Sequence, residues 1–164
     1  MNYRLIECCI LYECINDEVL VQRLRKYIHK QGKVVPRKRH GANRTEILKL
    51  IIERKLRNSI AFIDHDQPEN WSSRQVHILY NKRPFKSIGH AYWYHDRETN
   101  VLIIIFDRNL EDWLLRICKT KSITWDELHR NVKKFQKLLS NNRDIIQVFF
   151  KEVTELLHKY HIIS

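Results

Sequence analysis

The order of apolar runs in the first third of the chain constrains its fold more than any other feature. A mostly apolar run at 5–12 predicts a strand buried on both faces, 59–63 predicts a further strand, and 33–36 predicts a short strand between them. Helical periodicity fills the two intervals between these strands, at 16–32 and 47–56. Asn16 is the expected N-cap of the first helix and Gly32 its expected end. A strand, helix, strand, helix, strand order predicts an α/β fold with a parallel sheet flanked by crossover helices.

The middle of the chain predicts a loop and then a pair of strands. Residues 67–85 are polar and include two prolines, so we expect an insertion or lid loop there. The runs 87–95 and 100–106 are joined by a turn-like segment and are expected to pair as a hairpin. A short amphipathic helix is expected at 110–117.

The C-terminal part of the chain predicts helices only. Apolar stripes at 125–139 and 145–160 indicate two long helices with a short link, which we expect to form an antiparallel hairpin. We therefore expect an α/β domain at 1–120 and a helical extension at 121–164 that packs on the same domain. The exposed side of this extension is the expected surface for a second copy of the chain or for a protein partner.

The net charge of the protein lies in one segment. The chain carries 30 Lys and Arg against 19 Asp and Glu, a net charge of +11, and residues 22–57 hold 13 basic residues against 2 acidic ones. This segment therefore accounts for the whole surplus, which favours a polyanionic partner such as DNA or RNA. The residues expected to hold the nucleic-acid backbone are Arg37, Lys38, Arg39 and Arg44, and the first three of these lie in an expected loop. The alternative is that long basic side chains only solvate two amphipathic helices.

Composition excludes several sites and locations. With only 3 glycines, the chain has neither a Walker A loop nor a dinucleotide-binding turn. No apolar run is long enough to span a membrane, and the first residues do not resemble a signal peptide. The 4 cysteines show neither a disulfide framework nor a zinc motif, so reduced thiols are expected. These features predict a cytoplasmic protein without a membrane partner.

Acidic residues follow two of the predicted strands. Glu13 comes at the end of the first strand, and Asp64 and Asp66 follow the third. In parallel sheets, ligands bind beyond the carboxyl ends of the strands, so these carboxylates are expected to meet there. Oxygen ligands suit Mg²⁺ or Mn²⁺, and a cation beside a basic surface is suited to phosphodiester chemistry. The alternative is that the acids only cap helices and close turns.

The motif Glu13-Cys14-Ile15-Asn16-Asp17, followed by Asp64-His65-Asp66, resembles the TOPRIM domain over about residues 4–106. This is the catalytic module of topoisomerases, bacterial-type primases, OLD-family nucleases and small stand-alone proteins. The resemblance implies that Glu13 acts as general acid or base and that Asp64 and Asp66 bind Mg²⁺. Asp17 matches an acid found in primase-like members. The chain departs from the family pattern at Cys14, where glycine is usual, and it lacks glycine in the Asp-x-Asp loop.

The segment Arg108 to Leu114 is also similar to a segment of small stand-alone TOPRIM-like proteins, in which an acidic-Trp-Leu helix follows the last strand. This similarity would add Asp107 and Glu111 to the acidic cluster. The interpretation that we favour is simpler: the acids stabilise a helix N-terminus and Trp113 belongs to the core.

The resemblance implies a metal-dependent nuclease or phosphotransferase that acts on nucleic acid. A non-catalytic module of the same fold, which binds nucleic acid or a protein, stays open as the alternative. A receiver-like phosphotransfer protein is disfavoured, because it would carry an acidic pair after the first strand, where this chain has the single acid Glu13.

Overall fold

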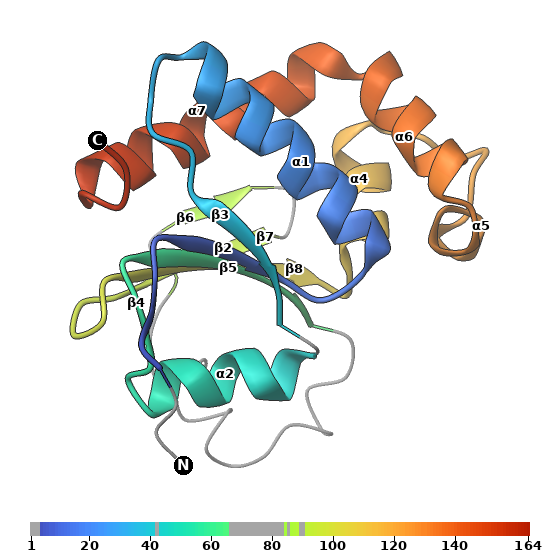
Figure 1. Ribbon diagram of the computed structural model, residues 1–164. Helices are drawn as coiled ribbons and strands as arrows, with labels where there is room; N and C mark the ends of the chain where they lie inside the picture. Colours follow the sequence, from blue (N-terminus) through green and yellow to red (C-terminus); the bar gives the residue numbers. More distant parts are fainter. Residues whose placement is uncertain (1–3, 42, 66–83, 85, 89–90) are drawn as a thin grey trace.

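The computed structural model describes residues 4–41, 43–65, 84, 86–88 and 91–164, which contain a mixed six-stranded sheet (Figure 1). In spatial order, its strands are β3 (Arg37–His40), β2 (Cys9–Tyr12), β5 (Ser59–His65), β8 (Val101–Asp107), β7 (Ala91–Asp96) and β6 (Lys86–Ile88). The strands β3, β2, β5 and β8 are parallel, whereas β7 pairs antiparallel with both β8 and β6. The predicted α/β class is confirmed, but the sheet is mixed because the hairpin of β7 and β8 joins it.

Helices cover both faces of this sheet (Figure 1). One face carries α1 (Ile15–Lys30), α4 (Leu110–Ile117), α5 (Trp125–Arg130), α6 (Val132–Asn141) and α7 (Arg143–Lys159). The other face carries α2 (Arg44–Ile52), together with a two-stranded parallel ribbon of β1 (Ile6–Glu7) and β4 (Leu56–Arg57). We call these the α1 face and the α2 face.

The strand side chains alternate between two hydrophobic cores. On β5, Ile60 and Phe62 pack with the helices of the α1 face, whereas Ala61 and Ile63 pack against α2. Phe135 of α6 and Phe149 of α7 lie in the same core as Phe62, so the C-terminal helices share the core of the sheet. Because both faces are buried, the central strands β5 and β8 are apolar except near their ends, as expected for parallel strands.

Several predicted boundaries are wrong for local reasons. Cys8 has a positive φ of 55°, which divides the predicted strand at 5–12 into β1 and β2. Leu56 lies in β4, so the second helix is shorter than its apolar pattern. The basic run predicted as a loop is the edge strand β3, and the strand predicted at 33–36 is absent there. Edge strands often carry charged residues, and β3 therefore lacks an apolar signature.

The C-terminal part of the chain is divided into more helices than the sequence predicts. Asn131 ends α5 and caps α6, so the predicted two-helix hairpin is a set of three helices. The predicted hairpin of strands around 96–100 and the helix at 110–117 are confirmed. The predicted loop at 67–85 falls almost wholly outside the described residues. Within the described part of the chain, none of the helices has the length and apolarity needed to cross a membrane.

Candidate functional site

Glu13 and Asp64 meet where β2 and β5 end at the same edge of the sheet. Glu13 follows β2, and its Oε2 accepts a hydrogen bond from the backbone N–H of Asp64 at 2.8 Å. Asp64 is the penultimate residue of β5 and is 8% exposed. Its Oδ1 accepts a hydrogen bond from the backbone N–H of Leu110, the first residue of α4, at 3.0 Å. The structure therefore brings together two of the predicted site residues and ties them to α4.

Asp17 lies in the first turn of α1 and is 2% exposed. Its Oδ2 accepts hydrogen bonds from the backbone N–H groups of Glu13 and Cys14, both at 3.2 Å. Its Oδ1 is buried and has no hydrogen-bond partner among the described residues. Burial raises the pKa of Asp17 to about 6, and the Glu111 charge adds to this effect. The Cys14 side chain opposes it by hydrogen bonding, as do the backbone N–H groups of Glu13 and Cys14. A buried carboxylate oxygen without a partner is costly unless it is protonated or binds a cation.

Cys14 completes a group of three possible metal ligands. One ligand atom from each of Cys14, Asp17 and Asp64 lies within 4.8 Å of the others. Burial raises the pKa of the Cys14 thiol far above its usual range, and the negative charges of Asp17, Asp64 and Glu111 raise it further. The thiol is therefore protonated at neutral pH in the metal-free protein. The two carboxylates suit Mg²⁺ or Mn²⁺, whereas a cysteine sulfur suits softer divalent metals.

Glu111 is a second buried acidic group, and its charge acts on both Cys14 and Asp17. It is 1% exposed, and its Oε1 accepts a hydrogen bond from Asn16 Nδ2 at 2.8 Å and lies 3.2 Å from His129 Nδ1. Asn16 also donates to the backbone carbonyl of Leu128 at 3.0 Å. Asn16 is therefore a buried link between three helices, and the prediction that it is the N-cap is wrong, because Cys14 occupies that position.

The other predicted acids occupy different places. Asp107 ends β8 next to His65 of β5, and its Oδ1 lies 3.6 Å from His65 Nδ1, at the half-buried rim of the site. Asp112 pairs with Arg116 within α4, and Trp113 is fully buried, so the prediction that Trp113 belongs to the core is confirmed. Glu111, by contrast, lies beside the acidic cluster and not only at a helix terminus. Asp66, the second aspartate of the motif, lies outside the described residues.

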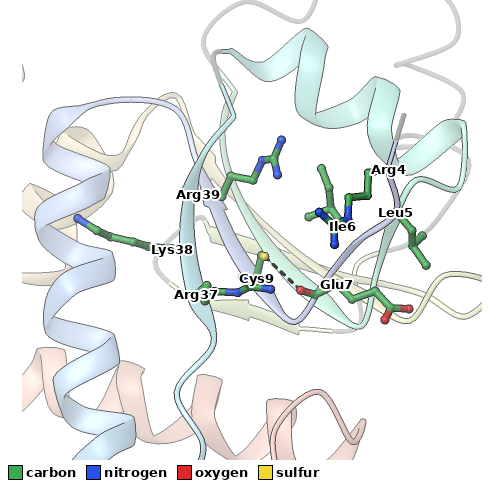
Figure 2. Close-up of a pocket in the computed structure, with 8 residues that line it drawn as sticks. All are labelled: Arg4, Leu5, Ile6, Glu7, Cys9, Arg37, Lys38 and Arg39. Atoms are coloured by element: carbon green, nitrogen blue, oxygen red, sulfur yellow. Dashed lines mark hydrogen bonds between the residues drawn. The ribbon is translucent and has the colours of Figure 1, made fainter. Parts of the chain in front are cut away.

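The four basic residues expected to hold a nucleic-acid backbone are divided between the two faces. Arg44 contacts the acidic site, since its Nη1 donates to the backbone carbonyl of Asp64 at 3.3 Å. Lys38 faces α1 and forms an ion pair with Glu18 at 2.6 Å. Because side chains alternate along a strand, Arg37 and Arg39 lie on the opposite, α2 face (Figure 2). The basic run therefore does not form a single surface beside the acids.

Sequence reasoning missed Cys14 as a possible ligand. The usable signal was spacing: residues 14 and 17 are three apart at a helix start, which places their side chains on one side of the first turn. No protein-family model matches the chain, and no significant similarity to a curated protein or to a solved structure was found.

Proposed function

We propose that this protein is a nucleic-acid-processing enzyme of TOPRIM type that cleaves a phosphodiester bond with the help of a divalent cation, Mg²⁺ or Mn²⁺. The observation that carries the proposal is the buried Oδ1 of Asp17, which has no described hydrogen-bond partner and belongs to the group formed with Cys14 and Asp64. A cation bound there would satisfy this oxygen and offset the cost of burying two carboxylates.

The proposed roles follow from these positions. Asp17 and Asp64 would hold the cation, and Asp66 is proposed as a further ligand from its place in the motif. The cation would supply polarisation of a phosphoryl oxygen. Glu13 lies beside them at the end of β2 and would exchange a proton with the attacking or leaving group. Arg44, which contacts the backbone of Asp64, would hold a phosphate next to the acids.

Cation binding and cleavage can be tested separately. In protein cleared of metal by EDTA, Mg²⁺ and Mn²⁺ should raise the melting temperature of the wild type but not of Asp64→Asn or Asp17→Asn. The matched control is Asp144→Asn, which removes the same charge from an exposed position on α7. Single-stranded and double-stranded DNA and RNA should then be tested for cation-dependent cleavage. If Asp64→Asn cleaves as well as the wild type, or if no substrate is cut, the enzymatic proposal fails.

A non-catalytic role is the second candidate. It is favoured by the hydrogen bond from the Asp64 N–H to Glu13, which gives this carboxylate a structural task that needs no reaction. In that case Glu13→Ala would lower stability, because the backbone N–H of Asp64 loses its acceptor, but it would leave nucleic-acid binding unchanged. A cytoplasmic location, and a second copy or protein partner at the C-terminal helices, belong to either version of the proposal.

A further inference from the structure

A basic pocket lies on the α2 face of the sheet, away from the acidic site. Its volume is about 540 Å³, and it forms between the start of β3 and the N-terminal segment that carries β1. Its walls include Arg4, Arg37 and Arg39, and its floor includes Ile6 and Cys9, which are 8% and 6% exposed (Figure 2). A pocket of this size accommodates a phosphate group together with part of a nucleoside.

The charge in this pocket is not neutralised by neighbouring acids. Within the described segments, Arg4, Arg37 and Arg39 form no ion pair with a carboxylate. Glu7 also lines the pocket, but Figure 2 shows its side chain directed away from Arg39. The pocket is therefore positively charged.

The positive charges of the two β3 arginines influence Cys9 at the floor of the pocket. Arg37 and Arg39 are two residues apart on one strand, so their side chains project from the same face. Burial raises the pKa of the Cys9 thiol, and the positive charges of Arg37 and Arg39 oppose this effect. Both guanidinium groups therefore lie near enough to Cys9 for their fields to be felt there. Like charges on one face of a strand repel each other, and an anion bound between them would reduce that repulsion.

We propose that this pocket binds a phosphate group of a nucleic-acid backbone through Arg4, Arg37 and Arg39. The guanidinium group donates two parallel hydrogen bonds, which match the oxygens of a phosphate. That the phosphate belongs to a nucleic acid rests on the proposed function. The existence of a phosphate site does not rest on that function, because binding of any phosphate compound would demonstrate it.

The course of β3 connects the pocket with the acidic site. Arg37 pairs with Cys9 at the start of β2, and His40 pairs with Tyr12, the residue before Glu13. These three residue steps span about 10 Å along the strand. A nucleic-acid strand advances about 3.4 Å per nucleotide along a duplex. A backbone held in the pocket would therefore reach the carboxyl edge of the sheet about three nucleotides further on. Because β3 is the edge strand, the backbone can pass from one face to the other around it.

The phosphate site is tested first with sodium pyrophosphate, against NaCl of equal ionic strength. At ten times its dissociation constant, pyrophosphate should raise the melting temperature of the wild type by about 3–6 °C. The double variant Arg37→Ala/Arg39→Ala should show no such rise. Without pyrophosphate it should melt no lower than the wild type, because a repulsion is lost. The matched control is Lys133→Ala/Lys137→Ala, which removes two exposed charges from α6 and should respond like the wild type. An equal rise in melting temperature in all three proteins would show that pyrophosphate does not bind in this pocket.

The nucleic-acid source is tested by the salt dependence of binding to a fluorescein-labelled 20-nucleotide DNA or RNA. Losing two phosphate contacts should make the fall in affinity between 50 and 200 mM salt about tenfold smaller in the arginine double variant. If pyrophosphate stabilises the wild type but the salt dependence is unchanged, the pocket serves a small phosphorylated ligand and the backbone assignment is wrong. If Asp64→Asn abolishes cleavage while both pocket tests fail, only the pocket is refuted. If both pocket tests succeed without cleavage, only the proposed catalysis is refuted.

Discussion

Replacing Asp17 by asparagine is expected to stabilise the metal-free protein at neutral pH. Burial raises the pKa of Asp17 from 3.8 to about 6, so the folded protein holds this proton more tightly than the unfolded chain does. One pKa unit corresponds to about 1.4 kcal/mol, so ionising Asp17 in the folded state costs about 3 kcal/mol. Asparagine is neutral, and its carbonyl oxygen can still accept the hydrogen bonds from the N–H groups of Glu13 and Cys14.

The sign of the pH dependence follows from the raised pKa. The cost is absent below pH 3.8, grows as the pH rises toward about 6, and is complete above that value. Urea unfolding in EDTA should therefore show that Asp17→Asn is more stable than the wild type by about 3 kcal/mol at pH 7.5 and by about 1 kcal/mol at pH 4.5. The exposed control Asp144→Asn should show no such difference between the two pH values.

Adding a divalent cation to the same unfolding experiment gives a further test. Mn²⁺ should stabilise the wild type at pH 7.5 and leave the variant unchanged, because the asparagine offers no negative charge to the cation. The reasoning is refuted if Asp17→Asn is less stable than the wild type by the same amount at both pH values. That result would mean that the Asp17 carboxylate is satisfied in the metal-free protein by groups other than those described.

Three further substitutions test individual contacts. Asn16→Ala should lower the free energy of unfolding, measured with urea, by about 2–3 kcal/mol, because Glu111 loses a buried hydrogen bond of 2.8 Å. An unchanged free energy of unfolding would show that Asn16 does not link the helices. Gly41→Ala should lower stability by about 1–3 kcal/mol, because a Cβ there would overlap the side chain of Ile47, and an unchanged melting temperature would show that Ile47 moves aside at little cost. Cys14→Ser should lose stabilisation by Cd²⁺ but keep that by Mn²⁺ in thermal unfolding, and equal loss of both would contradict a role of the sulfur in choosing the metal.

The elements predicted correctly from the sequence are those whose apolar side chains are also buried in the folded protein. Strands β5 and β8 are buried on both faces and stand out as apolar runs, and α4 follows directly from the spacing of its apolar side chains. The errors fall where tertiary contacts replace local signals. Leu56 continues an apolar helical pattern, but it pairs with Ile6 in a parallel ribbon. That pairing joins residues 50 apart, so local periodicity could not reveal it.

The acidic site was predicted in part, for a similar reason. Glu13 and Asp64 could be placed together because parallel strands bring their carboxyl ends to one edge. Glu111 was named as a possible further acid, but its hydrogen bond with Asn16 depends on how α4 and α5 pack against α1, which the sequence pattern does not specify. The sequence also gives no indication that one oxygen of Asp17 would be buried without a described partner.

The pleat of β3 decides what the basic run can do. As a loop, it would have allowed Arg37, Lys38 and Arg39 to converge on one phosphate. As a strand, it sends Lys38 to the α1 face, where Glu18 pairs with it, and leaves the two arginines on the α2 face. Under the proposed function, removal of Arg37 and Arg39 should therefore weaken binding without changing the cleavage rate at saturating substrate. Removal of Arg44, which contacts the backbone of Asp64, should lower that rate. If removal of Arg37 and Arg39 changed binding and the cleavage rate in the same way as removal of Arg44, all three arginines would hold the same phosphate. The strand geometry does not allow this.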